Sequence, residues 1–276
     1  MITRPCAKIN FGLNIVGIRP DGYHNIETIF YPVPIYDDIE ITEMDPLFTS
    51  LRNADLKITG TSVDCDEQKN LVIKAYNLLS ADFNIPRIHI HLYKNIPMQA
   101  GMGGGSADCA YAIKLLNRQF DLGLTSIQMK KYAAKLGADC AFFIDSVPSY
   151  ATGIGDILSP INVNFNGYSI VVVKPPVAVS TAQAYSKIIP ASPTISCIDA
   201  VKQPVETWHK LLSNDFEKPI FAEHPEIAYI KKHLYDLGAV FSMMSGSGSA
   251  VFGIFKKMPS DISKEFSNCI TITEVL

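Results

Sequence analysis

The chain has 276 residues, and its 24 lysines and arginines against 27 aspartates and glutamates give a formal net charge of −3 at pH 7. With 47% hydrophobic and 18% charged residues, it has the composition of a soluble globular protein with a large core, built as one large domain or two ordinary ones. The acidic balance argues against a broad nucleic-acid-binding surface, and no apolar run approaches the roughly 20 residues of a membrane span.

The cysteines and the N-terminus indicate the compartment. No cysteine belongs to a C-x-x-C pair or accompanies a histidine cluster, so we expect neither a zinc site nor a disulfide framework. The cysteines are Cys6, Cys65, Cys109, Cys140, Cys197 and Cys269. We expect them to be small buried side chains in a reducing compartment. Residues 1 to 8 show neither a signal-peptide core nor an Arg/Ser-rich transit peptide, which favours a cytoplasmic protein.

A lysine and an asparagine share one face of the first predicted strand. Apolar and other residues alternate over residues 6 to 16, the period of a strand, and Lys8 and Asn10 therefore point the same way. Their face is either a solvent-facing strand edge or part of a functional site. The strand alone does not decide between these alternatives.

An aromatic residue and a histidine follow a turn. Pro20-Asp-Gly22 is a turn signal, and it brings Tyr23 and His24 side by side at the turn exit. The pair is either ordinary packing or, in a nucleotide-binding protein, a means of stacking on a base and bonding its edge.

Two strands, a loop region and a helix are expected next. Residues 26 to 42 predict two strands, with an acidic turn at Asp37-Asp38. Residues 43 to 69 are polar and rich in turn residues, with one short strand expected at 56 to 59. Asn70 precedes an apolar stripe with helical spacing, so a helix should begin there.

The most informative stretch is a glycine loop between a strand and a helix. Alternating apolar residues over 88 to 93 predict the strand, and apolar residues at three-residue spacing after the loop predict the helix. Ser106 occupies the position expected for the helix N-cap. The loop glycines are Gly101, Gly103, Gly104 and Gly105. Glycines let a ligand approach the backbone, and the N–H groups of a first helical turn attract anions.

This glycine loop matches neither of two common nucleotide-binding patterns. No Gly-Lys-Ser/Thr follows it, so it is not a Walker A loop. Ser106 and Asp108 stand where a G-x-G-x-x-G pattern would need glycine. On this stretch alone, a flexible turn remains the alternative to an anion-binding loop.

A second informative stretch contains a single acid. Thr125 is expected to cap a helix whose apolar side includes Ile127. Asp139 is then the only charge among the small and apolar residues from 137 to 143. A carboxylate in such surroundings needs a partner or takes up a proton. Asp139 is therefore either the N-cap of a short helix or a catalytic group.

The rest of the chain contains a glycine-rich boundary and a small-residue loop. Residues 151 to 156 mark a plausible domain boundary. The loop Ser245-Gly-Ser-Gly-Ser249 lies between two buried strands over residues 240 to 255, so it is a tight functional loop or a packed hairpin and not a linker. The other expected elements are a strand at 169 to 173, a helix capped by Ser180 or Thr181, a loop at 190 to 203, helices at 204 to 214 and 225 to 237, and a final helix and strand ending at 273.

Together and in this order, these motifs resemble those of the GHMP kinases, a family of small-molecule kinases. The resemblance is carried by Pro5-Cys-Ala-Lys-Ile-Asn10, by the glycine loop from Pro97 to Ala110, and by Ser245-Gly-Ser-Gly-Ser-Ala250. Three further motifs narrow the resemblance to one part of this family. They are Pro20-Asp-Gly-Tyr-His24, Leu136-Gly-Ala-Asp-Cys-Ala-Phe142 and Ala151-Thr-Gly-Ile-Gly-Asp156. These last motifs are similar to those of one member, whose alcohol substrate carries a cytidine diphosphate group.

The resemblance implies a fold and a setting. It implies an α+β protein with an N-terminal ATP-binding domain over residues 1 to 152 and a ferredoxin-like C-terminal domain over residues 153 to 276. It also implies a cytoplasmic enzyme of isoprenoid precursor biosynthesis, a monomer or homodimer with a small-molecule substrate and no nucleic-acid or membrane partner.

The resemblance further implies ATP and Mg²⁺ as cofactors and transfer of the γ-phosphoryl group to the 2-hydroxyl of a methylerythritol unit. Asp139 is expected to act as the base, and Lys8 to keep Asp139 ionised and stabilise the transition state. Whether Asp139 abstracts the proton outright or acts through the field it shares with Lys8 stays open. The residues expected at the phosphates are Pro97, Gly101, Gly103, Gly104, Gly105, Ser106, Gly246, Ser247 and Gly248. Those expected at the adenine are Asn70, Lys94 and Asp108, while Ser106 is also the candidate ligand of Mg²⁺.

For the substrate, the resemblance implies a base-binding clamp. Tyr23 and Tyr185 are expected to stack on the cytosine, and His24 to bond its edge. Asn10 and Thr181 are expected to face the methylerythritol end.

The sequence departs from the family pattern at a few positions. Cys6 stands where proline is usual, and Met102 where leucine is commoner. Ala107 replaces a second serine of the loop, which leaves the exact ligands of the metal and the phosphates open. Two alternatives remain: a related GHMP kinase that acts on another alcohol, and a binding module without catalysis.

Overall fold

The computed structural model describes residues 1–48, 52–61 and 66–276. Residues 49–51 and 62–65, inside the stretch expected to be mostly loops, lie outside the described residues. The chain forms two compact units, and each is described by itself. The first unit is Met1–Ala7, Ile35–Met98 and Gly103–Ser146, and the second is Lys8–Pro34, Gln99–Met102 and Val147–Leu276. Both are discontinuous in sequence, whereas the domains predicted on either side of residue 152 are continuous.

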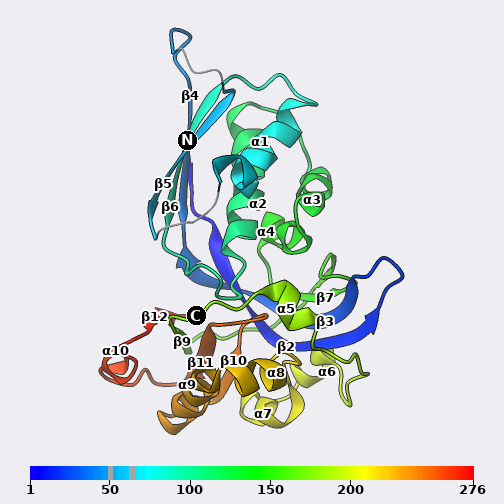
Figure 1. Cartoon of the computed structure of the whole chain (residues 1–276), viewed down its shortest axis with the longest axis vertical. Coiled ribbons are helices and arrows are strands. Elements are labelled where there is room, and N and C mark those ends of the chain that lie inside the picture. Colours follow the sequence, from blue (N-terminus) through cyan, green and yellow to red (C-terminus); the bar gives the residue numbers. More distant parts are fainter. Residues whose placement is uncertain (49–51, 62–65) are drawn as a thin grey trace. The chain divides into compact units, whose positions relative to one another are not determined.

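The first unit is built on a four-stranded sheet. The strand order is β1 (Ile2–Thr3), β4 (Asp38–Glu43), β6 (Ile88–Lys94) and β5 (Ala54–Gly60). Strand β4 is antiparallel to β1 and β6, whereas β5 and β6 are parallel. The helices of this unit are η1 (Glu67–Lys69), α1 (Leu71–Ser80), α2 (Gly104–Gln119), α3 (Ser126–Ala134), η2 (Ala138–Ala141) and α4 (Phe142–Asp145). Figure 1 shows α1 and α2 on one side of the sheet.

Local sequence signals account for most of this unit. In β6 the side chains of Ile88, Ile90 and Leu92 are buried and those between them are partly exposed, as the alternation predicts. Helix α1 begins after Asn70, as expected, and the Asn70 side chain caps it. Thr125 caps α3 in a capping box with Gln128. The apolar stripe predicted for α3 is wrong at Ile127, which is 69% exposed.

The second unit contains a sheet of long and short strands. The order is β2 (Cys6–Ile18), β3 (His24–Tyr36), β7 (Ser149–Thr152) and β8 (Ile157–Pro160). The first residues of β2 and the last two of β3 belong to the first unit. Strand β3 continues through Pro32 and Pro34. The glycine-rich stretch at 151 to 156, which was expected to mark a domain boundary, contains the turn between β7 and β8. These two strands pair in one antiparallel hairpin.

A second sheet in this unit has the ferredoxin-like arrangement that was expected. Strands β9 (Ser169–Lys174), β10 (Phe241–Met244), β11 (Val251–Phe255) and β12 (Ile270–Val275) run antiparallel in the order β10-β11-β9-β12. Helices separate β9 from β10 and β11 from β12, which gives the β-α-β-β-α-β pattern. These helices are α5 (Thr181–Tyr185), α6 (Cys197–Ala200), η3 (Val205–Thr207), α7 (Trp208–Leu211), α8 (Glu217–Glu223), α9 (Pro225–Asp236) and α10 (Ile262–Glu265).

Two expectations for the helices of the second unit were wrong, and one helix was not predicted. The stretch from 190 to 203 was expected to be a loop but contains α6, and α8 was not predicted. The helix expected at 204 to 214 is broken into η3 and α7. These helices have three to seven residues, too short for a helical period to be distinguished in the sequence.

The core of the second unit joins both of its sheets. The ring of Phe11 in β2 lies 5.0 Å from Phe165, 5.1 Å from Trp208 and 5.5 Å from Phe252 between ring centroids. Aliphatic residues from β2, β9, β11 and α9 form a further buried cluster in the same unit. Burial of these large side chains is the main stabilising contribution in this unit.

The cysteines follow the expectation where they are described. Four are buried, Cys269 is partly buried, and all five are free thiols. Cys65 lies outside the described residues. No helix in the described ranges is long and apolar enough to cross a membrane.

A glycine in β2 provides a test of this packing. Gly12 has φ of +70°, and a Cβ built on it would lie 2.5 Å from the Cys197 sulfur. We expect Gly12→Ala to lower the unfolding free energy by about 1–2 kcal/mol from backbone strain, and further from the collision with sulfur.

The matched control is Gly22→Ala, since Gly22 has φ of +83° and no heavy atom within 4 Å of a built Cβ. Chemical denaturation should show a smaller loss for this variant. A double-mutant cycle with Cys197→Ala should recover part of the Gly12→Ala loss. Equal losses for Gly12→Ala and Gly22→Ala would contradict the predicted collision.

Candidate active site

The second half of the glycine loop begins helix α2 in the first unit. Gly103, with φ of 72°, is the N-cap, and it has no side-chain capping bond. The prediction that Ser106 is the N-cap is wrong, because the left-handed turn at Gly103 starts the helix earlier. The first helical bond runs from Ala107 N to the Gly103 carbonyl at 2.8 Å. The preceding N–H groups of the first turn therefore lie outside the helical ladder and suit an anion.

The space over this first turn is open. A Cβ built on Gly105 would have no heavy atom within 4 Å, and Gly105 is exposed. At Gly104 a built Cβ would lie 3.1 Å from Ile96 and 3.3 Å from the Lys94 ammonium. The turn thus has a closed side and an open side. A phosphate group fits this arrangement of bare backbone at the start of a 16-residue helix.

The first half of the glycine loop packs against the small-residue loop at 245–249, within the second unit. The hydroxyl of Ser245 donates to the Gly101 carbonyl at 3.0 Å, and Ser249 N donates to the Gln99 carbonyl at 3.2 Å. A Cβ on Gly101 would lie 1.9 Å from the Ser245 carbonyl oxygen. Only glycine fits at Gly101, so the two loops predicted to lie near the phosphates are in contact through this residue.

The small-residue loop is held by two polar side chains. The amide of Asn214 donates to the carbonyls of Met244 and Gly246, both at 2.8 Å. Ser247 is buried, and its hydroxyl lies 3.0 Å from that of Thr181 at the start of α5. Thr181 was expected to bind substrate, and it adjoins the small-residue loop. Asn214 was missed, because an asparagine in a polar stretch has no distinctive sequence signal.

A buried ion-pair network lies beside α2 in the first unit. The Lys94 ammonium donates to Asp37 and, at 2.7 Å, to Asp108. Asp37 was expected in an acidic turn, and that prediction is wrong, since β3 ends at Tyr36 and β4 begins at Asp38 with the buried Asp37 between them. Its other oxygen accepts from the backbone N–H groups of Asn95 and Ile96 at 2.6 and 2.8 Å. The network joins the end of β6 to α2, on either side of the glycine loop.

The two carboxylates of the network differ in how well they are satisfied. Among the described residues, the Asp108 Oδ1 atom is buried without a hydrogen-bond partner. Burial raises the pKa of Asp108 from 3.8 to about 7, against the opposing charge of Lys94 and with the added repulsion of Asp37. Burial opposes the charge on Lys94 too, but the carboxylates of Asp108 and Asp37 outweigh it and raise the pKa of Lys94. Asp108 is therefore the carboxyl that most readily holds a proton.

The other residues predicted in the first unit occupy helix starts. Asn70 accepts from Val72 N at 2.9 Å as the cap of α1. Asp139 lies in the first turn of η2 and is partly buried. It is not the N-cap of η2, which is Gly137. Pro97 is buried just before the glycine loop.

Ser106 contacts a cysteine beside Asp139. Hydrogen bonds from the Cys109 thiol and the Ser106 hydroxyl lower the pKa of the Cys140 thiol, although burial opposes this. Ser106 is therefore linked to η2 through its hydrogen bond with Cys140. Ser106 is partly buried, and Ala107 is fully buried.

The face of β2 that carries Lys8 is buried, so its interpretation as a solvent-facing edge is wrong. Lys8 is 4% exposed, and Asn10 is not exposed at all. The Lys8 ammonium donates to the Asn10 Oδ1 atom at 2.7 Å and lies 4.7 Å from the centre of the Phe30 ring. The Lys8 backbone N–H donates to the Met102 carbonyl at 3.0 Å, so β2 also contacts the glycine loop. A buried lysine is rare without a specific purpose.

Two residues of the predicted base clamp lie together in the second unit. The His24 and Tyr185 rings are 4.9 Å apart between centroids and tilted by 33°. The other side of Tyr185 meets Phe216 edge-on at 4.8 Å. Tyr23 is 61% exposed. The structure thus brings His24 to Tyr185 and leaves Tyr23 at the surface.

The two predicted catalytic residues belong to different units, Lys8 to the second and Asp139 to the first. Their action on one hydroxyl group stays a prediction. Within the parts of the chain that are described, no group of three or more His, Cys, Asp or Glu side chains could hold a metal ion.

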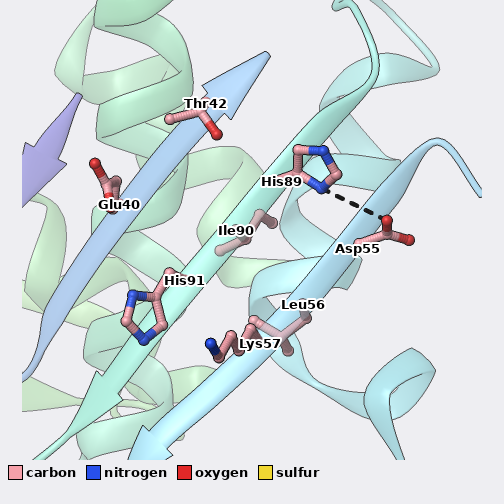
Figure 2. Close-up of a pocket in the computed structure, with 8 residues that line it drawn as sticks. All are labelled: Glu40, Thr42, Asp55, Leu56, Lys57, His89, Ile90 and His91. Carbon is pink, nitrogen blue, oxygen red and sulfur yellow. Dashed lines mark ion pairs between the residues drawn. The ribbon is translucent and has the colours of Figure 1, made fainter. Parts of the chain in front are cut away.

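A separate depression lies on the outer face of the first unit's sheet. It is lined by Glu40, Thr42, Asp55, Leu56, Lys57, His89, Ile90 and His91. Figure 2 shows their side chains on the strands in front of the helices, with an ion pair between His89 and Asp55. Lys94 lies on the same strand as His89 but alternates to the buried face. The depression shares no residue with the predicted site.

The raised pKa of Asp108 predicts a pH dependence of stability. From about pH 4 to about pH 7 the unfolded chain loses the Asp108 proton and the folded chain keeps it, so this group lowers the unfolding free energy as pH rises. Asparagine in its place has no proton to lose. Between pH 5 and 7 the stability of Asp108→Asn relative to the parent should therefore rise, by up to about 3 kcal/mol.

Denaturant unfolding of the two proteins across this pH range measures the difference, with the surface variant Asp121→Asn in parallel. A difference between Asp108→Asn and the parent that stays constant with pH would contradict the raised pKa.

The comparisons with known proteins agree with this arrangement. The family model described as "GHMP kinases N terminal domain" matches residues 70–151, and "GHMP kinases C terminal" matches residues 197–266. The chain is 50% identical over 255 residues to the 4-diphosphocytidyl-2-C-methyl-D-erythritol kinase of Bacteroides fragilis, across 92% of each chain. It is 51% identical over 259 residues to the enzyme of the same name from Bacteroides thetaiotaomicron, across 93% of this chain and 92% of that one.

Solved structures are also similar. A crystal structure of 4-(cytidine 5'-diphospho)-2C-methyl-D-erythritol kinase matches with a TM-score of 0.79 and 26% identity, covering 99% of this chain and 98% of that one. The homoserine kinase of Cytophaga hutchinsonii shares the fold, with a TM-score of 0.71 and 16% identity over 99% of this chain and 93% of that one. With both family models matched and half of the residues identical to curated relatives over nearly the whole length, the chain belongs to the GHMP kinase family.

Proposed function

We propose that the protein transfers the γ-phosphoryl group of ATP to the 2-hydroxyl of 4-diphosphocytidyl-2-C-methyl-D-erythritol, giving the 2-phosphate and ADP. The observation that carries this proposal is the identity of 50% or more over at least 92% of this chain to relatives that bear that kinase name. The reaction is a step of the non-mevalonate route to isoprenoid precursors. The reduced cysteines and the use of ATP support a cytoplasmic location.

The glycine loop supports the binding of ATP. The ATP phosphates would lie on the bare N–H groups at the start of α2, where the space over Gly105 is open. Phosphoryl transfer depends mainly on such positioning and on charge neutralisation. Mg²⁺ binds phosphates and keeps several waters, so it needs few protein ligands. Ser106, in the first turn of α2, remains its candidate ligand.

The adenine is proposed to lie near Asn70, Lys94 and Asp108. The Lys94 ammonium is engaged by two carboxylates, so its side chain would serve to orient Asp108. The Oδ1 atom of Asp108, which has no hydrogen-bond partner among the described residues, would accept from an amino group when ionised and donate to a ring nitrogen when protonated. This geometry supports an adenine contact through Asp108.

The chemistry at the hydroxyl requires a base and a cation. A tertiary alcohol becomes a useful nucleophile only as its proton leaves, and Asp139 is the proposed acceptor of that proton. Lys8 is proposed to neutralise negative charge as the phosphoryl group is transferred. The burial of Lys8 supports this role, because charge acts more strongly where water is excluded.

The cytidine end of the substrate is proposed to stack on Tyr185, whose ring contacts that of His24. The Thr181 hydroxyl lies 3.0 Å from that of Ser247 within the second unit, so the methylerythritol end would extend toward that loop. Tyr23 is exposed and available to close over the base.

A substrate panel tests the proposed reaction. ADP release should be rapid with the diphosphocytidyl substrate and slow with mevalonate or homoserine, since only the first has a base for Tyr185 and His24 to recognise. In the same assay Asp139→Asn should lose roughly 10²–10⁴-fold in kcat, the usual contribution of a general base, and keep its affinity for ATP.

Preference for mevalonate or homoserine would replace the proposed substrate. Absence of ADP release with all three would favour a binding module. Near-normal kcat of Asp139→Asn would remove Asp139 from the catalytic role.

The proposed base clamp predicts a selective loss of substrate affinity. Tyr185→Ala should weaken binding of the cytidine substrate by about 1–3 kcal/mol, the usual value of base stacking on an aromatic ring. ATP binding should be unaffected. Tyr185→Phe is the matched control because it keeps the ring and should keep the affinity. Calorimetric titration with each ligand measures both, and an equal loss for ATP and substrate would contradict the assignment.

A further inference from the structure

A continuous chain of hydrogen bonds runs from the Lys8 ammonium into the second unit. Lys8 donates to the Asn10 Oδ1 atom at 2.7 Å. The Asn10 amide nitrogen donates to the Thr28 hydroxyl at 3.0 Å. The Thr28 hydroxyl donates in turn to the backbone carbonyl of Gly12. The chain thus connects β2 to β3 and back to β2.

Each bond in this chain allows one direction only. An ammonium group can only donate, so the Asn10 amide must turn its oxygen toward Lys8. Its nitrogen then faces Thr28 and needs an acceptor. The hydroxyl accepts this bond and directs its own proton to the Gly12 carbonyl, which can only accept. A reversed amide would set its NH₂ group against the ammonium.

Water cannot easily take the place of the threonine hydroxyl. Thr28 and Asn10 both have no exposed surface. A buried amide that lost its hydroxyl partner would keep an unsatisfied donor and no longer have a preferred orientation.

We propose that Thr28 is a positioning residue, which sets the amide orientation of Asn10 and through it the position of the Lys8 ammonium. This inference rests on the proposed function, in which Lys8 acts on the transferred phosphoryl group. A lysine side chain has four rotatable bonds, and catalysis depends on placing its charge to well within about 1 Å. The Phe30 ring below the ammonium attracts it without fixing its direction.

The backbone of Thr28 has a separate, structural task. Its Cα pairs with that of Ala151 in the β3–β7 ladder. A substitution that keeps the shape and the strand propensity of threonine leaves this ladder in place. Thr28→Val does so because it replaces only the hydroxyl by a methyl group.

The test compares Thr28→Val with Thr28→Ser, which retains the hydroxyl. We expect Thr28→Val to lose roughly 10- to 100-fold in kcat with KM for ATP and substrate nearly unchanged, since a small displacement of the ammonium affects mainly the transition state. Thr28→Ser should recover most of kcat. The matched control is Thr271→Val, because the Thr271 hydroxyl is buried without a hydrogen-bond partner among the described residues. It should leave kcat unchanged.

A double-mutant cycle separates positioning from general structural damage. If Thr28 acts through Lys8, adding Thr28→Val to Lys8→Met should lower the residual kcat little further. A purely structural defect would lower it by the same factor in both backgrounds. If Lys8→Met alone keeps parental kcat, the proposed role of Lys8 fails, which is distinct from failure of the Thr28 inference.

Three results would overturn the inference. One is parental kcat in Thr28→Val with only the melting temperature lowered. Another is a full additional loss in the Lys8→Met background. If Thr28→Val does not fold, Thr28→Ala takes its place in the same assays. The third result is that neither Thr28→Val nor Thr28→Ala folds while Thr28→Ser does, which would assign the hydroxyl to structure alone.

Discussion

The first unit depends on one buried lysine held between two carboxylates. Lys94 ends β6, Asp108 lies in α2, and Asp37 joins β3 to β4. Removing charges from water is costly unless each is paired, so the three side chains hold their elements in one arrangement. Because Lys94 precedes the glycine loop and Asp108 follows it, the network fixes both ends of the loop.

A second buried lysine has different surroundings. Among its contacts, the Lys8 ammonium donates to the neutral amide of Asn10 and lies over the ring of Phe30, and Lys94 contacts two carboxylates. A lysine held between carboxylates suits a structural anchor. A buried lysine whose ammonium donates to an amide can, in our proposal, also act on a substrate. The same residue type thus serves stability in one unit and, in our proposal, catalysis in the other.

Sequence patterns predicted the elements with strong local signals. The alternation in β6, the Asn70 cap of α1 and the capping box of Thr125 each depend on residues close in sequence. The predictions failed where distant residues decide. From the sequence alone, Asp37 suggests a surface turn, but in the structure it is paired with Lys94. Ser106 suggests an N-cap, but the left-handed conformation of Gly103 begins the helix earlier. Short helices such as α6 were missed because tertiary packing stabilises them more than local propensity does.

The sequence by itself determined the family, the glycine loop and the choice of Lys8 and Asp139 as candidates, because these depend on residue types in a given order. The tertiary structure decided which polar groups are buried and which partner each one has. The structure buries the face of β2 that carries Lys8 and shows Thr28 hydrogen-bonded to Asn10. Hydrogen-bond partners far apart in sequence have no local signature, and only the requirement that buried polar groups be satisfied selects them.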